Sequence, residues 1–338
     1  ECDKQGVTFA TSSHRAEHFW FLNGGRTVGY DNEVLDEKYR DFYGPAHNIH
    51  KINNLHNLLK QEHGITPTKE WLEDWLVNSC ELIDKYHPET LFFDWWVMNY
   101  AFRPYMKKFL AYYYNRSVEW DKEVCVQYKS DAIMYNVGIF DRERGQLAAT
   151  SPYIWQSETS TAYNSWSYCT TNKFKTAGKI AGTFVDVISK NGNFVLNLGP
   201  KADGTFCEEE MQILEKLSDW TAKNKEAIWG TQPYKVFGEG KKHGNGSFNE
   251  KYNYSRKDYR FTYKTGSIYI FVLKPDRTTF KIKSLKYSGD MFAADIKNVE
   301  VLGYNQNLHY ERNNKCLKIE LDSPIETDMP LCFKVSID

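Results

Sequence analysis

Two patterns of hydrophobic and polar positions divide the 338-residue chain near Gly230. Upstream, short apolar runs typical of buried strands alternate with stretches in which apolar residues recur every three or four positions, as on one face of a helix. Downstream, apolar and polar residues alternate, which predicts strands. The chain therefore reads as an α/β part followed by an all-β part.

The first part predicts βα units around a parallel sheet. Strands are expected at residues 7–11, 90–93, 124–128 and 194–198. Helices are expected from Pro67, with Thr66 as the N-cap, to His87; from Pro104 to Tyr114; over residues 174–189; and from Glu208 onward. The strand at 90–93 is a continuous apolar run and is expected to be buried on both faces. The strand at 194–198 is also expected to be buried.

The second part predicts a small antiparallel β-sandwich, because short strands follow one another without a helical stretch. The strands are expected at residues 259–265, 268–273, 279–282, 299–302, 316–321 and 331–337. We therefore divide the chain into a barrel portion over residues 1–231 and a sandwich domain over residues 232–338.

Composition excludes several classes of protein. Lys and Arg (43) balance Asp and Glu (44), so the chain has no basic excess for nucleic acid, and its 41% hydrophobic content excludes intrinsic disorder. No apolar run approaches the roughly 20 residues of a membrane-spanning helix. The seven cysteines lack the spacing of a zinc site or a disulfide framework. Ten Trp and 23 Tyr fit either a large core or a surface that stacks on sugars.

Three carboxylates are candidates for catalysis. In a (β/α) barrel the reacting groups follow the carboxyl ends of the strands, and Asp94 ends the apolar strand 90–93. The alternative is that Asp94 caps a turn. A glycosidase needs a second carboxylate, and Glu143 and Glu158 lie in loop-like stretches after the strand at 124–128. Glu143 stands between two arginines, so it also fits a solvated charge cluster.

One motif points to a different chemistry. His14, Glu17 and His18 match the H-x-x-E-H pattern of inverted zinc hydrolases. A third metal ligand is not evident, and two glycines at 24 and 25 interrupt the helix that the motif needs. The same side chains also fit a hydrogen-bonding cluster at a strand end, which suits a polyol ligand.

Three long motifs carry a resemblance to a known family. They are ATSSHRAEHFWF at residues 10–21, PETLFFDWW at 88–96 and NGNFVLNLGPKADG at 191–204. Together they resemble the α-L-fucosidases of glycoside hydrolase family 29. The resemblance implies a retaining, double-displacement hydrolase on an irregular (β/α) barrel followed by a C-terminal β-sandwich, with no metal or other cofactor.

The resemblance also implies roles for individual residues. Asp94 takes the place of the nucleophile, and Glu143 is the expected acid/base, with Glu158 as the fallback. Gln156 stands where many members carry a glutamate after a tryptophan, so position 156 cannot supply the acid. Contacts with the sugar are expected from His14, Glu17, Trp20, Trp95, Lys129 and Trp166.

Two motifs of the family, His-Trp-Gly and Lys-His-His-Asp-Gly-Phe, do not occur in these residues. They follow the first two strands of the family's barrel, so those strands are expected on a separate or cleaved chain or before an internal start of the numbering. A homo-oligomer is a further expected assembly. A further alternative is a catalytically inactive, sugar-binding relative. The expected partner is a fucosylated oligosaccharide or glycoconjugate, which implies an extracellular, periplasmic or lysosomal location.

Overall fold

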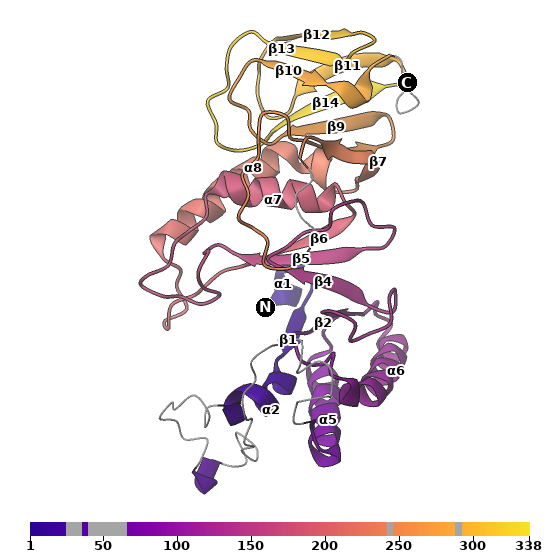
Figure 1. The fold of residues 1–338 in the computed structure, drawn as a ribbon, viewed down its shortest axis with the longest axis vertical. Helices are drawn as coiled ribbons and strands as arrows, with labels where there is room; N and C mark the ends of the chain where they lie inside the picture. Colours follow the sequence, from indigo (N-terminus) through magenta and orange to yellow (C-terminus); the bar gives the residue numbers. More distant parts are fainter. Residues whose placement is uncertain (25–35, 40–65, 242–245, 288–292) are drawn as a thin grey trace. The chain divides into compact units, whose positions relative to one another are not determined.

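The computed structural model describes residues 1–24, 36–39, 66–241, 246–287 and 293–338 (Figure 1). It divides into two compact units, residues 1–141 and residues 142–338. Within the described ranges, no helix has both the length and the apolar character that a bilayer span requires. The division between residues 231 and 232 stays a prediction, and secondary structure changes there from α8 (Glu208–Ile228) to β7 (Gln232–Glu239).

The first unit is built on parallel strands that follow one another in chain order. β1 (Ala10–Ser13) pairs with β2 (Thr90–Phe93), and β2 pairs with β3 (Cys125–Tyr128). β3 pairs in turn with β4 (Ile139–Glu143), which contains the boundary between the units. Ser13 lies opposite Phe93, and Phe93 lies opposite Tyr128, so β1, β2 and β3 end at the same level.

Aromatic side chains from the helices cover this sheet. The elements are α1 (Cys2–Gln5), α2 (Arg15–Gly24), α5 (Lys69–Tyr86) and α6 (Arg103–Trp120), with short 3-10 helices η2 (Glu37–Tyr39) and η3 (Tyr100–Phe102). Trp75 of α5 packs on Phe93 of β2, with 5.3 Å between ring centroids. Phe109 of α6 packs edge-on against the same Phe93 at 5.1 Å. Such aromatic contacts bury a large apolar area and fix the strands on the helices.

Several predicted boundaries in this unit are shifted. Thr68, not Thr66, is the N-cap of α5, because its hydroxyl accepts a hydrogen bond from the Trp71 backbone N–H at 3.2 Å. The first strand begins at Ala10 rather than at residue 7, and Val7 is 58% exposed. The second predicted helix continues past Tyr114 to Trp120. His87 ends α5 as predicted, in a left-handed conformation with φ 45°.

The second unit begins with a further βα arrangement. β5 (Trp155–Ser160) pairs in parallel with β6 (Gly192–Asn197), and α7 (Ala177–Ile188) connects the two. Thr176 caps α7 by accepting from the Lys179 backbone N–H. The prediction that the strand at residues 194–198 is buried is wrong, since Val195 is 41% exposed and Phe194, Leu196 and Asn197 are only partly buried.

Two antiparallel sheets then form the predicted β-sandwich. One has the order β11-β14-β9-β8-β7 and the other β10-β13-β12. Their further bounds are β8 (Tyr259–Lys264), β9 (Ser267–Val272), β10 (Thr279–Ile282), η4 (Lys283–Leu285), β11 (Ile296–Val301), β12 (Leu308–Arg312), β13 (Leu317–Leu321) and β14 (Leu331–Ile337). Phe280 of β10 meets Phe333 of β14 at 5.2 Å, so side chains of both sheets share one core. The alternation of apolar residues missed β7 and β12, whose residues are largely exposed or half-buried.

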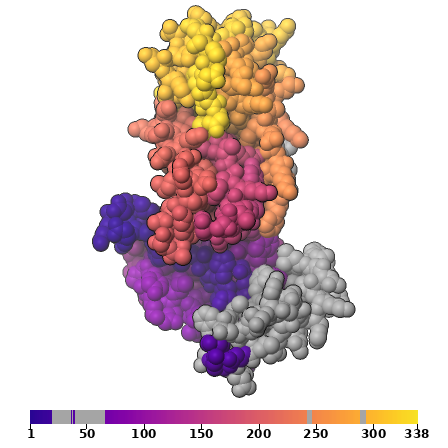
Figure 2. Space-filling view, turned by 90° about the vertical axis from the view of Figure 1, so that its left-hand side faces the viewer, coloured from indigo at the N-terminus to yellow at the C-terminus, as the bar shows by residue number. Residues whose placement is uncertain are grey.

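Helix α8 packs on this sandwich. The Trp220 indole N–H donates to the Pro330 carbonyl at 2.7 Å, and Trp220 belongs to a buried cluster that also contains Phe271. In the space-filling view of Figure 2, the residues of the sandwich are the orange to yellow atoms of the second unit. The barrel portion of this unit and its sandwich therefore share buried apolar contacts.

Candidate active site

Three side chains of the first unit leave successive strands at their carboxyl ends. His14 directly follows β1, Asp94 directly follows β2 and Lys129 directly follows β3. Because these parallel strands end at the same level, the three positions share one edge of the sheet. The sequence predicted each of these residues as a site residue, and the structure brings them together.

Lys129 is a buried cation between two carboxylates. Its Nζ lies 3.1 Å from Asp94 Oδ1 and 3.6 Å from Asp141 Oδ2, and its side chain is 1% exposed. The ammonium lies 5.1 Å from the centre of the Trp95 ring. The ammonium thus holds the Asp94 carboxylate at the end of β2, and a carboxylate held in a fixed position is what a nucleophile requires.

Replacing Lys129 with methionine is expected to lower kcat/KM by about 10²-fold, because Asp94 then loses the buried ammonium that holds its carboxylate in place. The measurement is steady-state kinetics with 4-nitrophenyl α-L-fucoside. Lys122→Met, on the surface of the same unit, is the matched control and should leave kcat/KM unchanged. An unchanged kcat/KM in Lys129→Met would contradict the role given to this lysine.

His14 connects Asp94 to Glu17. Its Nδ1 lies 3.5 Å from Asp94 Oδ2 and 3.1 Å from Glu17 Oε2. Burial raises the pKa of Glu17, and the neighbouring His14 opposes that shift. The Glu17 carboxyl offers hydrogen-bond acceptors and the His14 ring offers a donor or an acceptor, and this combination suits the hydroxyl groups of a sugar.

The structure does not assemble the two-histidine zinc motif. His14, Glu17 and Asp94 present ligand atoms within 4.8 Å of one another, and these three could hold a cation. His18 is not part of that group. Its Nδ1 lies 3.5 Å from Arg15 Nη1. Burial, with the charges of Arg15 and His14, lowers the pKa of His18. The zinc-hydrolase interpretation therefore lacks its second histidine ligand.

The predicted tryptophans differ in what the structure describes. Trp95 is half-buried beside Lys129. Trp20 lies in α2, and its side chain is outside the described residues. Trp166 belongs to the second unit, where its ring lies 4.3 Å from the Arg144 guanidinium carbon and its carbonyl accepts from Asn197 Nδ2 at 2.7 Å.

Both acid/base candidates lie on strands, so the prediction that they stand in loops is wrong. Glu143 is the last residue of β4 and is buried, and Glu158 lies in β5. The Arg144 backbone N–H donates to the Glu158 carbonyl at 2.8 Å, which joins the end of β4 to β5. Gln156 and Glu158 are two residues apart in β5, so their side chains point to the same face of the sheet.

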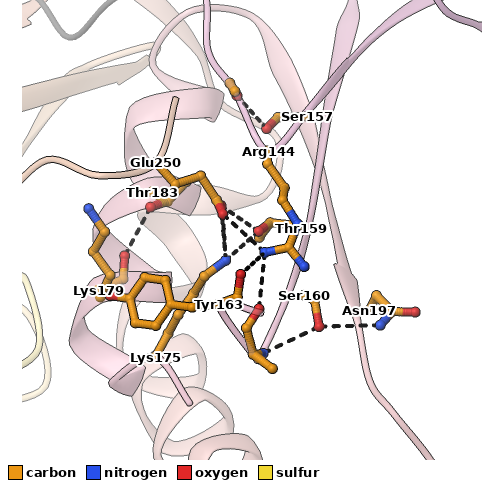
Figure 3. A network of polar contacts seen from close by, with 12 residues as sticks. Arg144, Ser157, Thr159, Ser160, Tyr163, Lys175, Lys179, Thr183, Asn197 and Glu250 are labelled. Atoms are coloured by element: carbon orange, nitrogen blue, oxygen red, sulfur yellow. Dashed lines mark hydrogen bonds and ion pairs between the residues drawn. The ribbon is translucent and has the colours of Figure 1, made fainter. Parts of the chain in front are cut away.

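Four polar residues that lie at the end of β4 or contact Thr159 of β5 were not predicted. They are Asp141, Arg144, Lys175 and Glu250, and Figure 3 shows the last three in one network. Asp141 is two residues before Glu143, so recognition of β4 as a strand would have placed both on one face. Glu250 comes from the segment between β7 and β8 and carries no local sequence signal.

Comparison with known proteins places these observations in a family. The model of the α-L-fucosidase family matches residues 1–226. An α-L-fucosidase from Branchiostoma floridae is 24% identical over 248 residues, which is 67% of this chain and 54% of that protein. The tissue α-L-fucosidase of Rattus norvegicus is 25% identical over 204 residues, 58% of this chain and 44% of that protein. The chain spans about half the length of these relatives.

Solved structures show the same fold. A Thermotoga maritima α-fucosidase in complex with fucose superposes with a TM-score of 0.60 at 23% identity, over 79% of this chain and 57% of that one. α-L-Fucosidase isoenzyme 1 from Paenibacillus thiaminolyticus gives a TM-score of 0.63 at 14% identity, over 99% of this chain and 73% of that one. The fold is thus a (β/α) barrel portion followed by a β-sandwich. Since the family's sequence model runs through the strands that carry His14, Asp94 and Lys129, the chain belongs to the α-L-fucosidase family.

Proposed function

We propose that this protein is a retaining exo-α-L-fucosidase that removes terminal α-L-fucose from glycans. One observation carries the proposal: Asp94, at the carboxyl end of β2, contacts the buried ammonium of Lys129 and the imidazole of His14. Membership of the α-L-fucosidase family supports the choice of substrate. Release of nitrophenol from 4-nitrophenyl α-L-fucoside by the full chain tests the activity, and fucose binding without release would contradict it.

In the first step of the proposed reaction, the Asp94 carboxylate forms a bond to the anomeric carbon while the bond to the leaving oxygen breaks. Glu143 gives its proton to that oxygen. In the second step, Glu143 takes a proton from water, the water oxygen bonds to the anomeric carbon, and the ester bond to Asp94 breaks. Two displacements retain the configuration, and in retaining glycosidases the two carboxyls stand about 5–5.5 Å apart.

The remaining site residues are proposed to hold the sugar. His14, Glu17 and Lys129 offer charged and neutral hydrogen-bonding groups for its hydroxyls. Trp95, Trp166 and Trp20 offer aromatic faces for its apolar face and methyl group. Residues 1–231 form the catalytic portion in this proposal, and residues 232–338 form the sandwich domain.

The substrate also bears on where the protein works. Fucosylated glycans lie outside the cytosol, so we infer an extracellular, periplasmic or lysosomal location. Assembly with a second chain or a second copy belongs to the same proposal, and light scattering of the purified protein tests it.

Replacing Glu143 with alanine is expected to lower kcat/KM by about 10²–10⁴-fold for substrates with poor leaving groups, because the leaving oxygen then departs without a proton. The loss should be small for 2,4-dinitrophenyl fucoside, whose leaving group needs no acid. Azide should restore turnover of the activated substrate by replacing water in the second step. If Glu158→Ala shows this behaviour and Glu143→Ala does not, Glu158 is the acid/base.

A further inference from the structure

A segment of the second unit pairs with the backbone that carries Glu143. This segment, residues 246–250, lies in the chain between β7 and β8. The Phe248 N–H donates to the Glu143 carbonyl at 2.9 Å, and the Asn249 N–H donates to the Arg144 carbonyl at 2.8 Å. Gly246 and Gln146 exchange backbone hydrogen bonds at 3.2 and 3.3 Å. At the end of β4, the Arg144 N–H is therefore bonded to β5, and the carbonyls of Glu143 and Arg144 are bonded to the 246–250 segment.

The side chain of Glu250 adds an ionic anchor to this pairing (Figure 3). Both of its carboxylate oxygens lie 2.9 Å from Lys175 Nζ, and one lies 3.4 Å from Arg144 Nη1. The Thr159 hydroxyl of β5 donates to the same carboxylate. Glu250 is 13% exposed and Lys175 is 2% exposed, so these charges interact with little screening by water.

Arg144 also binds the loop that carries Trp166. Its guanidinium donates to the carbonyls of Ala162 at 3.0 Å and Ser165 at 2.9 Å, and it lies against the Trp166 ring. The Arg144 side chain therefore links the loop that carries Trp166 to Glu250, with which Arg144 forms an ion pair.

Loss of the Glu250 charge would leave two buried cations close together. Burial lowers the pKa of Lys175, and the charge and hydrogen bond of Glu250 oppose that shift. A neutral side chain at position 250 removes this opposition, so Arg144 and Lys175 repel each other. Repulsion at this point displaces Arg144, which is covalently attached to Glu143.

We infer that Glu250 is a positioning residue for the acid/base step: it holds Arg144, and through Arg144 it fixes the backbone and orientation of Glu143. Glu250 itself is not a catalytic residue, because its carboxylate is engaged by Lys175, Arg144 and Thr159. The inference rests on the proposed role of Glu143. It identifies a glutamate, distant in sequence, whose effect should be confined to proton transfer.

The test compares Glu250→Gln with two substrates in the full chain. Proton donation matters for a fucosyl oligosaccharide, whose leaving group is poor, and matters little for 2,4-dinitrophenyl fucoside. We expect kcat/KM to fall by about 10-fold or more on the oligosaccharide, a part of the effect of removing the acid, and by less than about 3-fold on the activated substrate. Glu311→Gln, on exposed β12 of the same unit, is the matched control and should change neither value.

A second variant keeps the test decisive if Glu250→Gln does not fold. Arg144→Lys retains a positive charge beside Glu250 but loses the fork that holds the Ala162 and Ser165 carbonyls. The same selective loss on the oligosaccharide is expected. Equal losses on both substrates, or no loss in either variant, would overturn the positioning role. If Glu143→Ala shows no selectivity between the substrates, the proposed role of Glu143 fails instead.

Discussion

Replacing Asp94 with glycine is expected to lower kcat for 4-nitrophenyl α-L-fucoside on the order of 10⁴-fold or more, the scale on which covalent catalysis is lost with its nucleophile. The variant keeps Lys129 and His14, whose contacts with Asp94 mark the carboxyl end of β2. Binding of fucose should weaken far less, because the other groups proposed to contact the sugar are unchanged. The measurement is single-turnover and steady-state kinetics with the full chain.

Rescue by azide tests whether the carboxylate removed in Asp94→Gly is the nucleophile. In Asp94→Gly a small anion can take the place of the carboxylate, attack the anomeric carbon from the same side, and expel nitrophenolate. The product should be β-fucosyl azide, since only one displacement takes place. Asp131→Gly, an exposed aspartate of the same unit, is the control and should retain normal activity without azide. Near-normal activity of Asp94→Gly would show that another group is the nucleophile.

Replacing Asp186 with alanine is expected to destabilise the protein by about 3–5 kcal/mol, because it leaves buried cations without a counter-charge. Asp186, Lys190 and Arg260 are fully buried side chains of the second unit. Asp186 Oδ2 lies 2.6 Å from Lys190 Nζ, and its other oxygen accepts from Arg260 Nε. Burial lowers the pKa of Lys190, and the charge of Asp186 opposes that shift.

This triad joins α7 to β8 of the sandwich, so its loss should loosen the contact between them. A destabilisation of 3–5 kcal/mol corresponds to a fall in Tm of roughly 6–20 °C for a unit of this size. Differential scanning calorimetry measures it, with Asp219→Ala on the exposed face of α8 as the matched control. A Tm within about 2 °C of the control would mean that the triad contributes little to stability.

The strand ends were the part of the site that could be predicted from sequence. The strand that Asp94 ends is a short apolar run, and strands of this kind place their next residue at the mouth of a barrel. The resemblance to the family then indicated His14, which lies in the motif at residues 10–21, and Lys129, which follows the next strand. The structure brings these residues together because the register of the parallel strands places the ends of β1, β2 and β3 at one edge of the sheet, independently of the connecting loops.

The strands that carry Glu143 and Glu158 could not be predicted from hydrophobic pattern. In β4 the buried positions are Asp141 and Glu143, and in β5 they include Gln156 and Ser157. A strand prediction based on alternating apolar residues misses such segments and assigns them to loops. Burial of polar groups here is supported by partners distant in the chain, such as Lys129 for Asp141 and Gly145, whose carbonyl accepts from the Ser157 hydroxyl.

Glu250 illustrates a limit of the same kind. Its neighbours in sequence are polar and irregular, and nothing local distinguishes it from a surface glutamate. Its surroundings depend on the folded position of the segment between β7 and β8, which brings it to Arg144 and Lys175. Only three-dimensional contacts reveal a role of this sort.

The most direct test of the account is to find the residue that becomes attached to the sugar. A 2-deoxy-2-fluoro fucosyl fluoride slows both steps of a retaining glycosidase, and its good leaving group lets the covalent intermediate accumulate. Intact mass spectrometry, peptic digestion and fragmentation then locate the added mass. The account predicts one fluorofucosyl group on Asp94, lost again on turnover. A label on another carboxylate, or turnover of the fluoride to an inverted product without a label, would contradict it.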